Sequence, residues 1–401
     1  MNAPAIAGTR APAPRDVPRV RGELVIEQCS DLSWSRADVA ALDALIDLRP
    51  HVGVFMTHAW LSGYFAEPAR RSEPVVLVMR EGGAIRGVIP LAIRQTLTHA
   101  RVSLLGGGMG SDRVDLLTAR GYEGACSDRF MEWLEREFPR GYVLELRDVP
   151  DDSSLWGAIG RLTADKEPHV MFAPREVYAL PYLPLHDDRP GRIASDPIDP
   201  ESSTRHRRWL ERKCHVRIDA MTTADDVCQA FDTLGDLLRA RWGTEESVLE
   251  SARVQRFHRH VLPLLLREGR LRMMRILGDM RPIAVFYGLA SRLPETGAHR
   301  VASGDSWWGY YLAGYDRAWA GRIHLGRVAL AAAIDLAAKE GASEFDFLKG
   351  SERVKYLWPV RERISVDADV YSRNLGPRLT WAARAARTAA AALIRSTHEL
   401  R

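Results

Sequence analysis

The feature that most restricts the fold of this chain is an order of predicted elements that occurs twice. In each half, two apolar runs around a polar turn predict a β-hairpin, and a strand, a helix and a buried strand follow. The first copy begins with the hairpin at 74–95 and the second with the hairpin at 270–290. The copies share little sequence, and a coincidence of two α/β patterns is the alternative to a real repeat.

The first half contains further elements on both sides of its hairpin. Residues 22–29 predict a strand, apolar residues at helical spacing predict an amphipathic helix over 36–48, and the aromatic-rich segment 55–65 predicts a second helix. After the hairpin, whose turn is a Glu-Gly-Gly sequence, we expect a strand, a helix and a buried strand, over 101–108, 124–138 and 142–150.

The second half follows the same order. Its hairpin turns at Gly278 and Asp279, and a strand is expected over 299–308. An Ala- and Leu-rich helix is predicted over 326–340, where Gly341 stops it, and a short buried strand over 343–350.

A segment rich in Pro, Asp and Ser, 181–203, predicts a linker between the halves. We therefore expect a disordered leader over 1–20, an N-terminal unit over 21–185 and a C-terminal unit over 200–375. The fold class is α/β (α+β), with a mixed, mostly antiparallel sheet flanked by helices in each unit. A cleft between two such units is a usual place for a ligand.

Composition excludes several classes of function. The net charge is +4, from 56 basic and 52 acidic residues, and this balance is too even for a nucleic-acid-binding protein. It is compatible with an anionic small ligand or an acidic membrane surface. The four cysteines have no CxxC spacing, so we expect no zinc or redox site and no metal. Without an apolar signal segment or an apolar run of about 18 residues, a cytoplasmic location is expected.

Two basic segments are candidate anion sites. The predicted helix within 203–217 carries Arg208 and Arg212 on about three turns, and a solvated basic face is the alternative. The loop before the helix at 326–340 contains Arg322 and the glycines at 321 and 326. A helix N-terminus offers unpaired N–H groups and a positive dipole end, so this loop can hold a pyrophosphate, although an ordinary loop is the alternative.

A third candidate is the sequence FDFLKGSERVKYLW, 345–358. It places four ionisable groups at the C-terminal end of a strand, where α/β sheets bind ligands, namely Asp346, Lys349, Glu352 and Lys355. Only five of the 56 basic residues are lysines, and two of them lie here, which suggests a specific need for a lysine. A surface network of ion pairs is the alternative.

The final segment, 376–401, predicts an Ala-rich helix. One face carries Leu379 and Leu393 with alanines between them, and another carries Arg384, Arg387 and Arg395. This pattern is typical of a helix on an anionic membrane surface, so a peripheral contact with the inner membrane is one reading. A terminal helix docked on its own domain is the other.

The chain resembles the CelD-type acyltransferases, a branch of the GNAT fold found in bacterial envelope-polysaccharide loci. The resemblance rests on RHRRWLERK (205–213), LRARWG (238–243) and above all EFDFLKGSERVKYLW (344–358). In the first half it includes FMTHAWLSGYF (55–65) and LLGGGMGSDRVDLL (104–117), so it covers nearly the whole chain. The family is related in architecture to the Fem-type peptidyltransferases, which also pair two such domains.

The resemblance implies two tandem GNAT-like domains and transfer of an acyl group from acyl-CoA to an amine or hydroxyl of a sugar or lipid-linked precursor. By position in the fold, Arg322, His324 and Gly326 would bind the pyrophosphate of the acyl-CoA co-substrate. The loop departs from the usual GNAT spacing of Arg/Gln-x-x-Gly-x-Gly/Ala, because three residues separate Arg322 from Gly326. Residues expected at the acceptor are Arg208, Arg212, Trp242, Lys349, Tyr356 and Trp358.

For the chemistry we expect Asp346 as general base with a raised pKa, and Glu352 as second choice. Lys355 or Tyr356 would donate a proton to the leaving thiolate or anchor a phosphate. Long-chain transfer onto a sphingoid base, an aminoacyl-tRNA-dependent transfer of the Fem type and a non-catalytic module that has lost CoA are the alternatives.

Overall fold

The computed structural model describes residues 22–67, 72–106, 110–164, 167–185, 201–243, 249, 251–292, 306–319, 322–350 and 352–399. The expected leader, most of the expected linker and residues 299–305 of one expected strand lie outside them. Within the described residues, thirteen strands form one sheet in the order β1-β2-β3-β4-β6-β13-β7-β12-β11-β10-β9-β8, and β5 pairs with β3.

The strands of the first half are β1 (Val25–Cys29), β2 (Glu73–Glu81), β3 (Ala84–Gln95), β4 (Ala100–Leu104), β5 (Leu117–Thr118), β6 (Tyr142–Pro150) and β7 (Val170–Pro184). Those of the second half are β8 (Val216–Ala220), β9 (Leu271–Gly278), β10 (Arg281–Ala290), β11 (Trp307–Tyr315), β12 (Glu344–Asp346) and β13 (Arg361–Ser372). Among the strands that the structure describes, only the pairs β4–β6 and β11–β12 are parallel. The expected mixed, mostly antiparallel sheet is confirmed.

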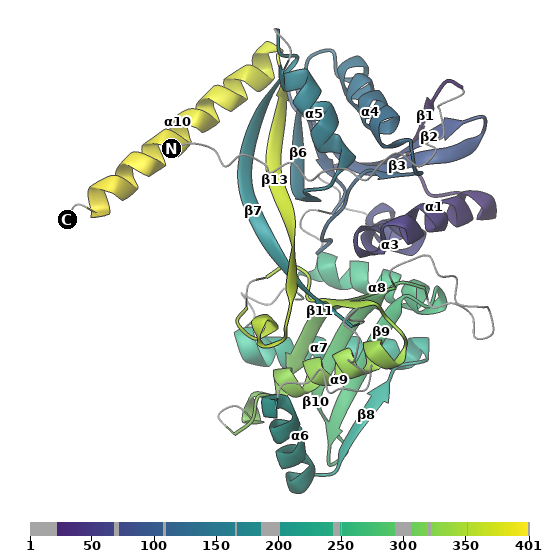
Figure 1. Cartoon of the computed structure of the whole chain (residues 1–401), viewed down its shortest axis with the longest axis vertical. Coiled ribbons are helices and arrows are strands. Elements are labelled where there is room, and N and C mark those ends of the chain that lie inside the picture. The colour runs from purple at the N-terminus through teal and green to yellow at the C-terminus, as the bar shows by residue number, and fades with distance from the viewer. Residues whose placement is uncertain are drawn as a thin grey trace, which may run out of the picture.

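Helices flank the sheet in both halves (Figure 1). In the first half they are α1 (Arg36–Leu48), α2 (Pro50–Gly53), the 3-10 turn η1 (Val54–Met56), α3 (His58–Phe65), α4 (Glu123–Glu137) and α5 (Ser154–Ala164). In the second they are α6 (Glu201–Lys213), α7 (Ala224–Trp242), α8 (Ala252–Arg267), the turn η3 (Arg317–Trp319), α9 (Leu325–Lys339), the turn η4 (Lys355–Leu357) and α10 (Leu375–Glu399). Figure 1 shows α10 extending away from the sheet.

Both halves have the connectivity that the sequence repeat predicts. The hairpin β2–β3 continues into β4, α4 and β6, and β6 pairs in parallel with β4. The hairpin β9–β10 continues into β11, α9 and β12, and β12 pairs in parallel with β11. A strand–helix–strand crossover therefore follows a hairpin in each half, as a parallel pair requires.

The sheet runs through both halves because β13 inserts into the first one. β13 lies between β6 and β7, and Val370 pairs with Leu144 on one side and with Phe172 on the other. The last residues of β7 also pair with β12, so that Asp346 lies opposite Tyr182. The chain thus closes its N-terminal sheet with a strand from its C-terminal end.

The halves also meet where α3 packs on α8. Gly63 of α3 lies so close to Phe257 that a Cβ at this position would be 2.5 Å from the ring, and only glycine permits this approach. Around this contact Trp60, His258 and Tyr311 form a buried aromatic cluster, in which the ring centroids of Trp60 and His258 are 5.9 Å apart. Burial in this apolar surrounding lowers the pKa of His258 to about 3.

We predict that His258→Gln makes folding less sensitive to acid. Because the folded pKa of His258 is depressed, its contribution to stability is fully present above pH 6.5, its ordinary value, and is lost as the pH falls below it. In that range the unfolded chain takes up a proton that the folded chain excludes. The free energy of unfolding therefore falls by about 1.4 kcal/mol for each pH unit. Urea unfolding at several pH values measures the slope. His215→Gln, at an exposed position, should keep the wild-type slope, and so would His258→Gln if the assignment is wrong.

Candidate active site at the parting of two parallel strands

The sheet opens where β11 and β12 part. The two strands pair only from Trp307 opposite Glu344 to Gly309 opposite Asp346, and β12 ends there. β11 continues to Tyr315 with β10 on its other side, and among the described residues no strand covers residues 310–315 on the side that β12 leaves. This part of β11 therefore presents backbone N–H and C=O groups that an extended ligand can pair with.

A β-bulge lies in the same stretch of β11. Tyr287 of β10 pairs with Leu312 and Gly288 pairs with Tyr310, so Tyr311 is the extra residue. A bulge leaves the extra residue unpaired and re-aims its neighbours, and bulges are common beside active sites. Gly110 contacts Tyr311 directly, because a Cβ on Gly110 would lie 2.2 Å from the tyrosine Oη. The loop around Gly110 of the first half thus reaches the parting of the strands.

A buried ion pair fixes this loop against the end of β12. Arg113 Nη2 lies 2.7 Å from Asp346 Oδ2, and each side chain is 1% exposed. Trp307 Nε1 donates to the same carboxylate at 3.1 Å, and the N–H of Leu348 donates to Asp346 Oδ1 at 2.8 Å. Arg363 Nη1 approaches to 3.5 Å. Asp346 is thus surrounded by donors and cations from both halves.

The expectation of a raised pKa for Asp346 is wrong. Burial alone would raise this pKa, but the charges of Arg113 and Arg363 and the hydrogen bonds from Trp307 and Leu348 outweigh burial and lower it. The carboxylate therefore stays ionised and committed to its partners, and a general base needs the opposite, a carboxylate that accepts a proton readily. The geometry makes Asp346 an anchor of the site.

A second carboxylate, that of Asp112, has the raised pKa that was expected for Asp346. Asp112, half-buried beside Arg113, accepts a weak hydrogen bond from the N–H of Lys349 at 3.4 Å. Burial first, and the neighbouring carboxylate of Asp148 second, raise the pKa of Asp112 to about 6. Asp148 accepts from Ser365 and from the N–H of Arg113, and burial raises its pKa as well. Two interacting carboxylates of this kind are typical of acid–base sites.

Two lysines with different surroundings lie in the segment after β12. The Nζ of Lys355, which is 3% exposed, donates to the carbonyls of Lys349 and Gly350 at 2.8 and 3.3 Å and pairs with Glu352 at 2.9 Å. Gly350 has φ 122°, and a Cβ there would lie 2.8 Å from this Nζ. Lys355 thus closes a tight loop that requires glycine. Lys349 is exposed, with its Nζ 3.7 Å from the centre of the Tyr178 ring.

The other residues expected near the end of β12 differ in their exposure to solvent. Tyr356 and Glu352 are exposed, and the Tyr356 hydroxyl donates to Glu362 at 2.9 Å. Trp358 is buried and packs on Phe347 with ring centroids 5.9 Å apart, which places it in the core. The side chain of Trp242 lies outside the described residues.

The two basic segments come together at the N-terminus of α9. The His206 ring of α6 meets the ring of His324 edge-on with centroids 5.1 Å apart. His324 precedes α9 and makes no side-chain cap. No described residue accepts a hydrogen bond from the N–H of Leu325 or Gly326, and such groups at a helix N-terminus can bind an anion. Arg322 is exposed beside it.

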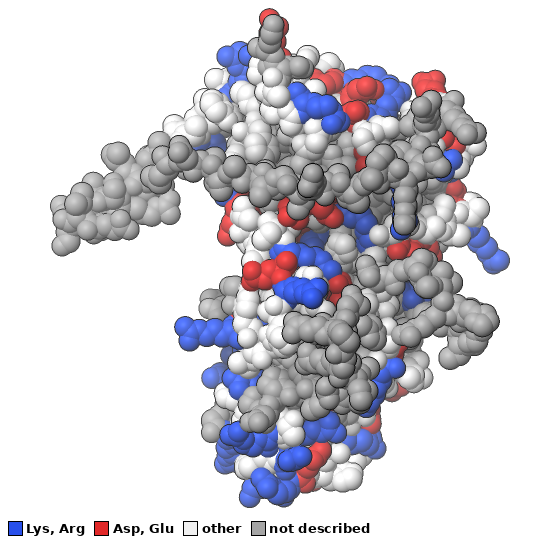
Figure 2. Space-filling model, in the orientation of Figure 1, with Lys and Arg blue, Asp and Glu red and all other residues white. Residues whose placement is uncertain are grey.

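The helix α6 adds a basic surface to this end of the molecule. Lys and Arg side chains gather over the lower end in Figure 2, where α6 lies. Arg208 and Arg212 are exposed on this helix. The structure thus groups them with Arg322, His324 and Gly326, while Asp346, Lys349 and Lys355 form a second group at the end of β12.

Sequence reasoning missed the residues contributed by the first half. Asp112 and Arg113 lie in a glycine-rich stretch whose chemistry had no assigned role. Their signal is the polar sequence Ser-Asp-Arg between Gly110 and the apolar residues that follow. Buried charges of this kind need a partner, but the sequence does not show that Asp346 is the partner.

Comparisons with known proteins agree with this fold. Residues 201–356, less than half of the chain, match the family model described as an acetyltransferase (GNAT) domain. A conserved protein of unknown function from Bacteroides thetaiotaomicron is 10% identical with a TM-score of 0.51, and the match covers 84% of this chain and 97% of that one. FemX is 10% identical with a TM-score of 0.50, and the match covers 87% and 98%. No curated protein matches the chain.

At such low identity the solved structures show the fold alone. The family match places a GNAT acetyltransferase domain in the second half of the chain. In the described part of the chain, no helix is long and apolar enough to cross a bilayer, and no group of His, Cys, Asp or Glu has the arrangement of a metal site.

We predict that Asp346→Asn lowers the free energy of unfolding by about 3–5 kcal/mol, because it leaves the guanidinium of Arg113 buried without a counter-charge. The double variant Arg113→Met/Asp346→Leu removes both charges, so it should recover part of the lost free energy of unfolding. Chemical denaturation measures the difference, with Asp236→Asn as control, because Asp236 is an exposed carboxylate of α7 paired with the exposed Arg239. If Asp346→Asn were as stable as the wild type, the pair would not anchor the site.

Proposed function

We propose that the chain transfers an acyl group from acyl-CoA to an amine or hydroxyl of a sugar or lipid-linked precursor in bacterial envelope or exopolysaccharide biosynthesis. The observation that carries the acyl-CoA part is the parting of β11 and β12 beside the loop around Asp112. The acceptor class rests on the resemblance to CelD-type acyltransferases and on the basic surface of α6. A cytoplasmic location is part of the same proposal.

The free edge of β11 fits the arm of CoA. The pantetheine arm is an extended chain with two amides, and residues 310–315 offer backbone donors and acceptors in an extended conformation. The pyrophosphate would lie at the N–H groups of Leu325 and Gly326, with Arg322 as an added charge. β11 leads through η3 into this helix end, so one continuous segment can serve both parts of the molecule.

The chemistry we assign to the parting of the strands is direct transfer. The amine attacks the carbonyl carbon of the thioester, a C–N bond forms, the C–S bond breaks, and the thiolate leaves. Asp112 takes the proton that the amine loses, because its raised pKa brings it near the working pH. A backbone N–H of the bulge at Tyr311 is the donor that we assign to the carbonyl oxygen. This assignment replaces Asp346 as base.

The role given to Lys355 changes with this assignment. Lys355 has its three donors committed to two carbonyls and a carboxylate, so we assign it to holding the loop rather than to protonating the thiolate. Lys349 and Tyr356 are exposed near the end of β12 and remain candidates for contact with the acceptor. Arg208 and Arg212 remain candidates for an anionic acceptor or for the phosphates of CoA.

Two alternatives are tested by the same measurement. Long-chain transfer onto a sphingoid base predicts tight binding of palmitoyl-CoA and weak binding of acetyl-CoA, and a non-catalytic module predicts binding of neither. Isothermal calorimetry with both thioesters on the full chain separates these cases from the leading proposal. Binding of neither thioester would overturn acyl-CoA as the donor.

The helix α10 has the composition for contact with an acidic membrane. Leu375, Leu379 and Trp381 are 72%, 61% and 39% exposed. Arginines are the only charged residues of α10 before Glu399. Such a helix can lie at a bilayer surface, which would bring the enzyme to a lipid-linked acceptor.

We predict that Asp112→Asn lowers kcat by about 10²–10⁴-fold, because removal of a general base has effects of this size, while CoA affinity stays nearly unchanged. Asp128→Asn, an exposed carboxylate of α4, is the control. Release of the CoA thiol in steady-state assays measures kcat. Wild-type turnover in Asp112→Asn would remove this residue from the chemistry.

The carboxylate of Asp112 should also make kcat/KM depend on pH. A base works when ionised, so kcat/KM should rise with pH up to about 6 and fall about tenfold per unit below it. Asp112→Asn should abolish this acid limb in its residual activity. An unchanged acid limb in that variant would assign the limb to another group.

We predict that Arg322→Gln weakens CoA binding about tenfold, because one charge-assisted contact to phosphate is lost. Arg281→Gln, also exposed and in the second half, should bind like the wild type. Calorimetry with CoA itself gives the affinities. Equal affinities for wild type and Arg322→Gln would place the pyrophosphate elsewhere.

A further inference from the structure

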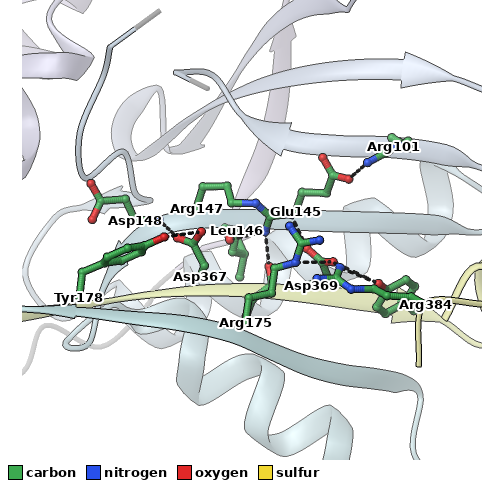
Figure 3. Close-up of polar contacts among 12 residues, drawn as sticks. Arg101, Glu145, Leu146, Arg147, Asp148, Arg175, Tyr178, Asp367, Asp369 and Arg384 are labelled. Atoms are coloured by element: carbon green, nitrogen blue, oxygen red, sulfur yellow. Dashed lines mark hydrogen bonds and ion pairs between the residues drawn. The ribbon is translucent and has the colours of Figure 1, made fainter. Parts of the chain in front are cut away.

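One face of the central strands carries a group of charged residues that the acyl-transfer proposal does not use. Arg147 of β6, Arg175 of β7 and Arg384 of α10 converge on Asp369 of β13, and we call these three the arginine cluster (Figure 3). Arg147 Nη2 lies 2.6 Å from Asp369 Oδ1, and Arg175 Nε lies 3.3 Å from Oδ2. Arg384 pairs with Oδ2 as well.

The cluster has more positive charge than its carboxylates neutralise. Asp369 is one carboxylate for three guanidiniums, and Arg101 alongside is paired with Glu145. Asp367 also lies near, bonded to the N–H of Asp148 and to Tyr178. Among the described residues, the carboxylate that pairs directly with all three guanidiniums of the cluster is that of Asp369 alone. Burial first and the charge of Arg147 second lower the pKa of Arg175.

The donors of the cluster are reachable, whereas its carboxylate is not. Asp369 is 2% exposed, but the side chains of Arg147, Arg175 and Arg384 are 30%, 35% and 31% exposed. Among the described residues, the two Nη atoms of Arg175 have no protein partner. The buried carboxylate therefore orients the guanidiniums and leaves N–H groups directed toward solvent.

Anchoring α10 does not explain the whole arrangement. Of the three arginines, Arg384 is the one on α10, and it joins this helix to the sheet because it pairs with Asp369 and donates to the Tyr371 hydroxyl at 3.2 Å. Arg147 is held by the carbonyls of Leu146 and Ala368 at 2.7 and 2.9 Å, independently of α10. A second and a third guanidinium on one carboxylate add repulsion without adding an anchor. A ligand with negative charge would relieve this repulsion.

We propose that the arginine cluster binds a phosphate group of a ligand on this sheet face, at a site separate from the one assigned to CoA. Guanidinium groups bind phosphate through paired hydrogen bonds, and three of them held by one buried carboxylate need little further ordering. The phosphate can belong to a soluble phosphate ester or to a lipid headgroup, because the chemistry of both is the same. Leu375 and Leu379 of α10 are exposed apolar side chains that a bilayer can contact, so a lipid source is tested separately.

The test uses the full chain at low salt with two probes. Calorimetry with glycerol 1-phosphate tests the soluble source, and co-sedimentation with vesicles of phosphatidylcholine, with or without phosphatidylglycerol, tests the lipid source. We expect binding in at least one arm and a weakening of about tenfold in Arg175→Gln. Binding should also fall as salt is raised.

The matched control is Arg161→Gln on α5, because Arg161 is likewise an exposed arginine paired with one aspartate, Asp128. It should bind like the wild type. Arg175→Gln should fold, since Asp369 keeps Arg147 and Arg384, and thermal unfolding checks this; Arg175→Lys, which keeps the charge but loses the fork, should give an intermediate affinity. Binding of neither probe, or equal losses in Arg175→Gln and Arg161→Gln, would overturn the proposal. CoA affinity should be unchanged in Arg175→Gln, so failure here leaves the acyltransfer proposal intact.

Discussion

The buried pair of Arg113 and Asp346 is the interaction on which the site depends. It joins a loop of the first half to the last residue of a short strand of the second, where water cannot screen either charge. Because each partner would be costly to bury alone, the loop cannot leave and β12 cannot shift without a large penalty. Asp112 next to Arg113 is consequently held at the opening between β11 and β12.

Anchoring the site and accepting a proton are tasks of two different carboxylates, which the sequence alone does not distinguish. Asp346 stands at a strand end, as a catalytic carboxylate often does, but its surroundings keep it ionised and occupied. Burial of Asp112 and its carboxylate neighbour, Asp148, raise its pKa. The lysines show the same division, since Lys355 holds a loop together while Lys349 remains exposed.

Local signals accounted for much of the fold. Apolar spacing predicted α1 with its observed bounds, and the hairpins at 74–95 and 270–290 are present. The predicted helix at 55–65 divides because the Thr57 side chain caps α3 by accepting from the N–H of Trp60. The strands β7 and β13 were not predicted, and β7 contains three prolines and a bulge and shows no regular alternation of buried and exposed residues. The pairing of Arg113 with Asp346 depends on contacts between distant segments, which spacing cannot reveal.

The insertion of β13 between β6 and β7 has a consequence for how the chain is made. When a ribosome has released the first 185 residues, the strands β6 and β7 exist but the strand that joins them does not. The N-terminal sheet therefore stays divided, with two exposed edges, until synthesis is nearly complete. Folding of the first half must wait for the last strand of the second, so the two halves are expected to form as one cooperative unit, and a truncation before residue 361 removes order from both.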